Sequence, residues 1–116
     1  MYLKSEIEQQ PTVIGRLITD NMNPTQTVVD AIKAFDPTFV CIAARGTSDN
    51  AARYAQYLFG HALGLPVMLA APSLHTIYET PPNLSRALVI GISQSGKAED
   101  VRTVLQDANE QGALTL

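Results

Sequence analysis

The sequence has 116 residues, of which 46% are hydrophobic and 16% charged, and this balance indicates one small globular domain and excludes a disordered chain. Its formal net charge of −3 argues against a broad surface for nucleic acid or for an anionic membrane. The single cysteine, Cys41, cannot form an internal disulfide, no Cys/His cluster has metal-binding spacing, and no apolar run is long enough to span a membrane. We therefore expect no metal, no cofactor and a cytoplasmic location.

The first third of the chain has the pattern of helices. Apolar residues recur at helical spacing from Ile7 to Ile18, and Pro11 is expected to interrupt this helix. Asn23-Pro24 has the pattern of an N-cap followed by a proline in the first turn, and Asp36-Pro37 is expected to end that second helix. The sequence thus predicts an N-terminal helical lead-in over residues 1–35.

The remaining residues, 36–116, alternate between short apolar runs and segments with helical periodicity. Such alternation predicts an α/β fold with right-handed crossovers and a parallel sheet buried on both faces. We expect a flavodoxin-like doubly wound sheet with the strand order 2-1-3-4-5, truncated near its fourth strand, so that the domain is incomplete. The expected strands cover residues 39–44, 66–70, 87–92 and 113–116, and the expected helices cover 51–62, 74–79 and 97–111.

The loop that follows the third expected strand carries several groups that suit an anion. Ser93 and Ser95 offer hydroxyl groups, Gln94 offers an amide, and Gly96 allows the backbone to approach a ligand closely. The next helix is expected to begin near Lys97, which would direct unpaired backbone N–H groups towards the loop. Phosphate binding is one interpretation, and simple capping of the helix by serine is the other.

The loop after the first expected strand, Arg45–Asn50, follows the same logic. Gly46 breaks the strand, and the hydroxyl of Thr47 or Ser48 could face a sugar or a phosphate. Any of Thr47, Ser48 or Asp49 could instead cap the next helix without a ligand. In the expected strand order the first and third strands are neighbours, so both loops would meet at the carboxyl edge of the sheet, where ligands bind in such folds.

Catalytic residues are harder to identify. His75 and Glu79 are four residues apart near the end of the second expected strand, and they are the only acid–base candidates near the predicted crevice. An exposed pair on a short helix, without a catalytic role, is the simpler interpretation. Cys41 is expected to be an inert thiol in the core, and His61 an exposed residue late in a helix.

Three sequence motifs together resemble the sugar isomerase (SIS) domain, specifically the isomerase half of glucosamine-fructose-6-phosphate aminotransferase and of related aminosugar-phosphate isomerases and deaminases. Glu6–Pro11 resembles the lead-in "EI-x-EQP" with one additional Gln. Ala44–Ser48 resembles "ACGTS", with Arg45 where Cys is common, and Ile92–Gly96 matches "ISQSG". The order and spacing of the motifs fit essentially the whole chain.

The resemblance implies roles for individual residues. Ser93, Gln94 and Ser95 would hold the phosphate of a hexose 6-phosphate or an aminosugar phosphate, and Thr47 and Ser48 would line the same pocket, with Gly46 and Gly96 beside them. After Gly96 the family often has Glu and then Thr, whose hydroxyl contacts phosphate. This chain has Lys97 and Ala98 at those positions, so one hydroxyl is lost and one cation is gained.

The resemblance also sets expectations for the whole protein. Related enzymes usually carry two SIS domains, are dimers, and have most of their ring-opening and proton-transfer residues in the second domain. We therefore expect a phosphosugar-binding SIS domain of an isomerase, aminotransferase or deaminase that forms a homo-oligomer and lacks a complete active site. The alternative is a non-catalytic regulatory SIS domain that senses a phosphosugar.

Overall fold

The computed structural model describes residues 2–116. The chain divides into two compact units, one ending at Ala34 and the other covering Phe35–Leu116. Each unit is described by itself below.

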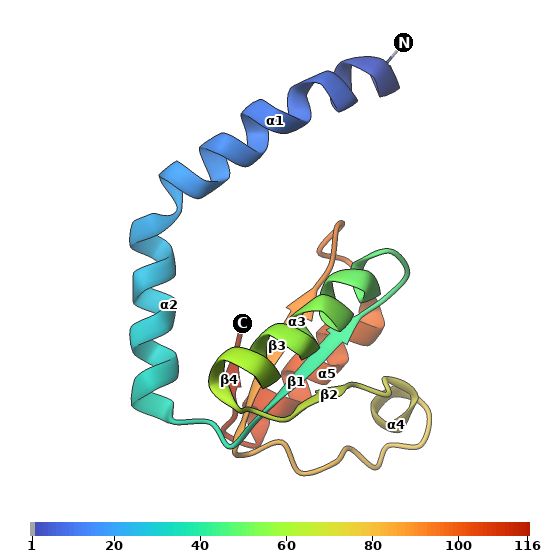
Figure 1. Ribbon diagram of the computed structural model, residues 1–116. Helices are drawn as coiled ribbons and strands as arrows, with labels where there is room; N and C mark the ends of the chain where they lie inside the picture. Colours follow the sequence, from blue (N-terminus) through green and yellow to red (C-terminus); the bar gives the residue numbers. More distant parts are fainter. Residues whose placement is uncertain (1) are drawn as a thin grey trace. The chain divides into compact units, whose positions relative to one another are not determined.

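The N-terminal unit consists of two helices, α1 (Tyr2–Asp20) and α2 (Met22–Phe35) (Figure 1). The expected interruption at Pro11 is wrong, because α1 continues through this proline. Proline removes one backbone hydrogen bond, and on an exposed helix water can satisfy the carbonyl oxygen that is left without a partner. The second helix begins at Met22, so Pro24 lies inside its first turn rather than at its first position. It ends at Phe35, as Asp36-Pro37 predicted.

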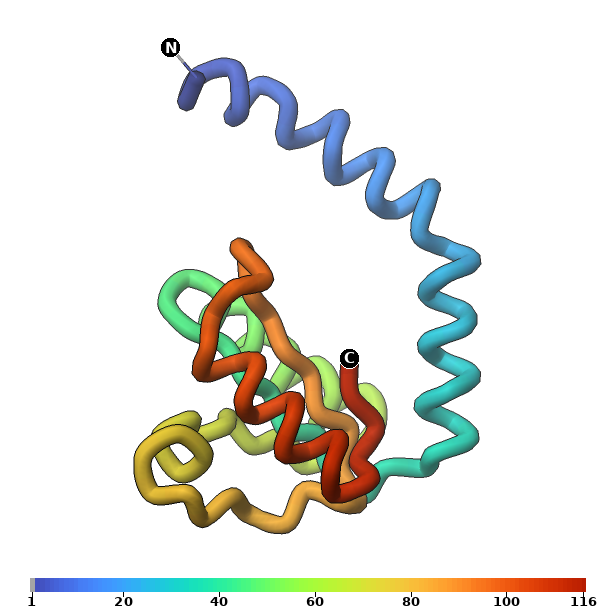
Figure 2. Tube along the Cα trace, turned by 180° about the vertical axis from the view of Figure 1, so that it is seen from behind, coloured from blue at the N-terminus to red at the C-terminus, as the bar shows by residue number. Residues whose placement is uncertain are grey.

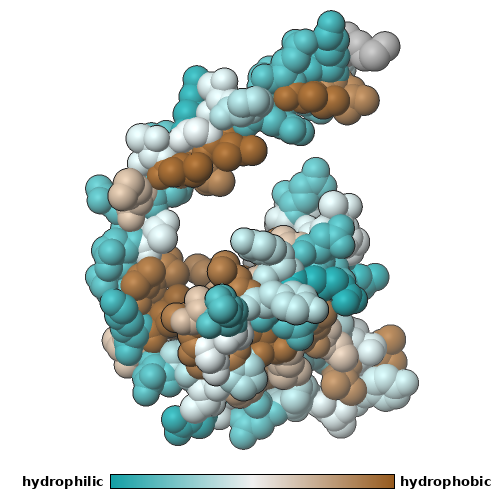
Figure 3. Space-filling model, viewed as in Figure 1, coloured by the Kyte–Doolittle hydropathy of each residue, from teal (hydrophilic) through white to brown (hydrophobic). Residues whose placement is uncertain are grey.

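Helix α1 is amphipathic, and its apolar side is exposed within this unit. Figure 3 shows hydrophobic side chains gathered along one side of the helix. Ile7, Ile14, Leu17 and Ile18 each expose more than half of their surface, between 53% and 68%. An apolar stripe of this kind usually packs against another surface in a folded protein.

The second unit is built around a parallel sheet of four strands: β1 (Phe39–Ala44), β2 (Val67–Leu69), β3 (Ala87–Ile92) and β4 (Leu114–Thr115). The strand order is β2-β1-β3-β4, and all three pairings are parallel. The α/β, flavodoxin-like fold predicted from the sequence is therefore confirmed.

Helices cover both faces of this sheet. Helix α3 (Ser48–Leu63) lies on one face and α5 (Glu99–Glu110) on the other, and the four-residue helix α4 (Ser73–Thr76) packs beside α5 (Figures 1 and 2). Gly64 ends α3 in the left-handed conformation with φ of 65°, as a glycine after a helix commonly does. Helix α5 begins two residues later than the sequence predicted, at Glu99 rather than near Lys97.

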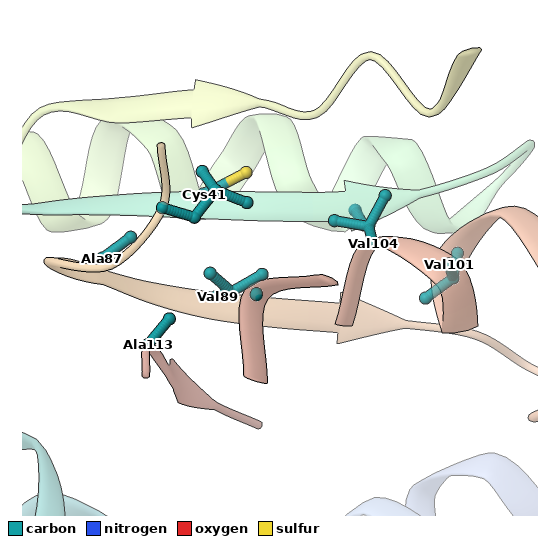
Figure 4. Packing of buried hydrophobic residues seen from close by; sticks show 9 residues of the cluster. Cys41, Ala87, Val89, Val101, Val104 and Ala113 are labelled. Carbon is teal, nitrogen blue, oxygen red and sulfur yellow. The ribbon is translucent and has the colours of Figure 1, made fainter. Parts of the chain in front are cut away.

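The main core lies between the sheet and α5. Figure 4 shows Cys41 and Val89 of adjacent strands pointing towards Val101 and Val104 of this helix. Gly91 lies on the same face, and a methyl group added there would lie 2.7 Å from Leu105 Cδ1. The absence of a side chain at Gly91 therefore lets α5 approach β3 closely, which fixes where the helix begins beside the loop that precedes it.

Candidate functional site

The register of the sheet brings the two serine-bearing loops together. Strands β1 and β3 are paired along their whole length, with Ala44 opposite Ile92 at the carboxyl end. The next residues, Arg45 and Ser93, therefore leave the sheet from adjacent strands, whose usual spacing is about 4.8 Å. Both views of the backbone show the β1–α3 and β3–α5 loops side by side at the same end of the sheet (Figures 1 and 2).

These loops enclose an open crevice of about 660 Å³. A volume of this size is within the range of small-molecule sites. Six of the seven predicted binding residues line the crevice. The seventh, Gly96, follows Ser95 in the β3–α5 loop but is not part of the lining. The complete lining is Arg45, Gly46, Thr47, Ser48, Ala51, Ile92, Ser93, Gln94, Ser95 and Ala98.

The β3–α5 loop is held by its own serine side chains. The backbone N–H of Gly96 donates to Ser93 Oγ at 3.1 Å, and the N–H of Lys97 donates to Ser95 Oγ at 3.1 Å. Gly96 has a φ of 65°, which a residue with a side chain rarely adopts. Each serine oxygen accepts a hydrogen bond here, so its own proton stays available for donation to a ligand oxygen.

The interpretation of these serines as caps of α5 is wrong. The N-cap residue of α5 is Ala98, which has no side chain to cap the helix, and the serines bond within the loop instead. The first backbone N–H groups of α5 therefore have neither an intrahelical partner nor a side-chain cap from their N-cap residue. An anion placed in the crevice would meet hydroxyl groups and the positive end of a helix dipole.

The opposite loop presents hydroxyl groups in a similar way. Thr47 is the N-cap residue of α3, and its side chain makes no capping hydrogen bond. The turn is closed by the backbone, because the N–H of Asp49 donates to the carbonyl of Gly46 at 3.1 Å. The hydroxyls of Thr47 and Ser48, both in the crevice lining, are thus not needed to cap this helix by their side chains.

An ion pair joins the β1–α3 loop to the first turn of α5, and the sequence analysis did not predict it. Arg45 Nη1 pairs with Oδ2 of Asp100, in the first turn of α5. The guanidinium-bearing side chain is 62% exposed and that of Asp100 is 32% exposed. The sequence signal was the arginine itself, which stands where the resembling motif has cysteine, but its partner could be found only from the strand register.

The candidates for acid–base catalysis lie elsewhere. His75 is buried, with 6% of its surface exposed, and its Nδ1 atom is 2.7 Å from Asp107 Oδ2. Asp107 is eight residues after the start of α5, about 12 Å along the helix from the end at the crevice. Glu79 is exposed, has a φ of 51°, and like His75 is not among the lining residues. The structure therefore does not bring this pair to the crevice.

Cys41 lies in the core in the middle of β1, and its neighbours in the strand, Val40 and Ile42, are also buried. Burial raises the pKa of the Cys41 thiol from 9.0 to about 11, because the thiolate would lose its hydration. The thiol is therefore protonated at neutral pH and is a poor nucleophile, in agreement with its interpretation as a core residue.

Within residues 2–116, no three His, Cys, Asp or Glu side chains gather closely enough to hold a metal ion. Over the same part of the chain, no helix has both the length and the apolar character needed to cross a membrane.

Comparisons with known proteins identify related sequences. The chain is 37% identical over 119 residues to glutamine–fructose-6-phosphate aminotransferase (isomerizing) of Streptococcus pneumoniae TIGR4, an alignment that covers 99% of this chain and 20% of the relative. It is 33% identical over 117 residues to the enzyme of the same name from Aquifex aeolicus, with 99% of this chain and 19% of the relative covered. No family model matches the chain.

A solved structure agrees with these sequence relatives. A protein from Silicibacter pomeroyi DSS-3, itself assigned provisionally as a phosphosugar isomerase, superposes with a TM-score of 0.90 and 35% identity. The match covers 96% of this chain and 34% of that protein. The resemblance to this group, inferred from the three motifs, is thus confirmed, and the chain spans about one fifth of the length of its curated relatives.

Proposed function

We propose that the crevice between the two loops binds the phosphate of a phosphorylated sugar, either a hexose 6-phosphate or an aminosugar phosphate. One observation carries the proposal: the hydroxyl groups of Ser93 and Ser95 line the same crevice as those of Thr47 and Ser48. The aminotransferase relatives and the phosphosugar isomerase neighbour support the choice of a sugar phosphate over another anion.

The chemistry of the loops suits a dianion better than a neutral sugar. A phosphate presents several strong acceptor oxygens, and the crevice offers donors from hydroxyls, from Gln94 and from the first N–H groups of α5. Hydrogen bonds to a charged group are worth roughly 1.5–3 kcal/mol each, more than bonds to a sugar hydroxyl. The phosphate end of the ligand is therefore the part that these residues recognise.

Within a larger enzyme, this crevice would serve an aldose–ketose isomerase, aminotransferase or deaminase. In such a reaction a base moves a proton between C1 and C2 of an open-chain hexose phosphate. We assign this chain the task of holding the phosphate so that the reacting carbons are positioned, which accelerates a reaction by orientation. A non-catalytic sensor of a phosphosugar would use the same crevice and differs only in lacking turnover.

Calorimetry with fructose 6-phosphate and with fructose tests the binding proposal. We expect the phosphorylated sugar to bind at least tenfold more tightly, and equal affinities would contradict the proposal. Ser95→Ala should weaken binding of fructose 6-phosphate roughly tenfold to a hundredfold. Ser85→Ala is the matched control, because Ser85 also makes a local hydrogen bond, to Asn83, but precedes β3 at the opposite end of the strand.

An isomerase assay separates the enzymatic from the sensory alternative. The purified chain should bind the phosphosugar without converting it, because its crevice lining contains no histidine and no carboxylate that could act as a base. Turnover would show that the chain itself carries a complete active site. If a longer protein containing this domain converts the sugar, the enzymatic alternative is favoured over the sensor.

We further propose that residues 1–35 are a lead-in to the SIS domain formed by residues 36–116, and that the protein forms a homodimer in the cytoplasm. The apolar side of α1 supports self-association, because an exposed stripe of Ile7, Ile14, Leu17 and Ile18 is a surface that a second copy could cover. Light scattering should give twice the mass of one chain. A stable monomer would contradict the dimer.

A further inference from the structure

The start of α5 carries two carboxylates beside the proposed phosphate loop. Glu99 and Asp100 are the first residues of this helix, and Ala98, which precedes them, lines the crevice. Acidic residues in the first turn interact favourably with the helix dipole. They also repel an anionic ligand bound next to the same turn, so the helix start has two opposing electrostatic effects on phosphate binding.

Arg45 compensates one of these carboxylates from the other side of the crevice. It follows β1, lines the crevice, and pairs with Asp100 in the first turn of α5. Among the other charged groups nearby, Lys97 is exposed at the end of the phosphate loop, and Asp49 is already paired with Arg53 within α3, at 3.1 Å. Arg45 is thus the one charged residue among the described residues that line the crevice, and its positive charge is balanced by the carboxylate of Asp100.

We propose that Arg45 is a positioning residue that makes the crevice selective for phosphorylated sugars by neutralising Asp100. The inference rests on the proposed function of the same crevice. With the ion pair formed, the dianion meets a neutral pair. Without the guanidinium, it meets an unpaired carboxylate. In water, a dianion and one like charge at a separation on the order of 8 Å repel each other by about 1 kcal/mol at low salt, which is roughly a three- to tenfold change in affinity.

The proposal distinguishes Arg45 from a residue that simply stabilises the fold. An exposed ion pair contributes little to stability, about 0–1 kcal/mol, so removing it should barely change the melting temperature. It also distinguishes Arg45 from a direct phosphate ligand. If Arg45 acts through Asp100, removing that carboxylate must restore the affinity that the loss of the arginine removed.

A double-mutant cycle on the full chain tests this, with fructose 6-phosphate binding measured by calorimetry at low salt. We expect Arg45→Ala to bind roughly three- to tenfold more weakly. Arg45→Lys should retain most of the affinity, because it keeps the charge. The double variant Arg45→Ala/Asp100→Asn should bind about as well as the unmodified protein. The defect of Arg45→Ala should shrink at 0.5 M salt, where the Debye length is only about 4 Å.

Arg86→Ala is the matched control, because it removes an exposed arginine that directly precedes β3, at the opposite end of the strand from the crevice. It should change affinity less than about twofold. Normal binding by Arg45→Ala would overturn the inference while leaving the proposed function intact. A double variant as weak as Arg45→Ala would also overturn it, since Arg45 would then contact the phosphate itself. If the unmodified chain fails to bind fructose 6-phosphate, both proposals fall together.

Discussion

Ala98 offers a gain-of-function test of the proposed phosphate site. It is the N-cap residue of α5, with φ of −64° and ψ of 108°, and its side chain cannot make a capping hydrogen bond. The backbone already has the extended conformation that a capping residue needs. Ala98→Thr would place a hydroxyl group at the helix start and in the crevice lining, at the position where the resembling family often has threonine.

The expected effects on stability and binding are separate and both are measurable. An N-cap threonine in place of alanine should stabilise the protein by about 1 kcal/mol, because it satisfies one N–H group of the first turn. The threonine oxygen accepts that bond and keeps its own proton for the ligand. One additional hydrogen bond to a charged phosphate should then tighten binding by about 1.5 kcal/mol or more, which is roughly tenfold.

Ala98→Val is the matched control, because valine has the shape of threonine without the hydroxyl. Ala98 is half-buried and packs against the core, so any strain from the larger side chain is shared by both variants. Urea unfolding gives the stability difference, and calorimetry with fructose 6-phosphate gives the affinity difference. If threonine is no better than valine in stability, α5 does not need this cap. If it is no better in affinity, the phosphate does not lie at the start of α5.

Two further predictions concern the core beneath the crevice. Gly91→Ala should destabilise the protein by about 1–2 kcal/mol, because its methyl group would lie 2.9 Å from Val101 Cγ1, a β-branched side chain that cannot rotate away in a helix, and 2.7 Å from Leu105 Cδ1. Gly60→Ala, in α3, should instead stabilise it by about 0.5–1 kcal/mol, because the added methyl group would meet only the Leu65 carbonyl oxygen, at 4.0 Å. Equal effects of the two substitutions in urea unfolding would refute the packing argument. Because burial raises the pKa of Cys41 to about 11, folding favours the protonated thiol, and its contribution to stability should be lost as pH rises from about 9 to 11. The free energy of unfolding, measured at pH 8, 9.5 and 11, should therefore fall less steeply with pH for Cys41→Ala than for the unmodified protein.

The strands were predictable because the apolar runs that form them are local features of the sequence. Residues 39–44 and 87–92 form continuous apolar runs, and the structure has strands at these same residues. The alternation with helical segments then leaves few parallel topologies. Helix boundaries were less predictable. Pro11 lies inside α1, because an exposed helix loses little when one carbonyl turns to water. Pro24 lies in the first turn of α2, where its missing N–H would have no intrahelical partner.

The side-chain pairs of the second unit could not be read from the sequence. Arg45 and Asp100 are separated by more than fifty residues, and only the pairing of Ala44 with Ile92 places them on the same edge of the sheet. His75 was paired in the sequence with Glu79 because helical spacing suggests contacts four residues apart. Its partner is instead on α5, because the short helix α4 packs against that longer helix.

His75 is expected to have a structural role that can be separated from binding. Its imidazole is buried and holds the β2–β3 connection to α5 through the 2.7 Å contact with Asp107, far along the helix from the crevice. His75→Ala would remove this contact and leave a cavity, and we expect a loss of about 2–4 kcal/mol in the free energy of unfolding. His61→Ala is the matched control, because His61 is exposed near the end of α3, and its loss should change stability by less than about 0.5 kcal/mol.

The two readouts decide between a structural and a catalytic His75. If the residue is structural, folded His75→Ala binds fructose 6-phosphate like the unmodified protein at a temperature well below its lowered midpoint. Asp107→Asn should be milder than His75→Ala, because the amide oxygen can still accept a hydrogen bond from the ring. A His75→Ala protein that unfolds at the normal urea concentration but loses tenfold in affinity would place the histidine at the ligand. That result would make His75 a candidate for chemistry in the crevice again. It would also require the ligand to extend towards Asp107, about 12 Å along α5 from the start of the helix.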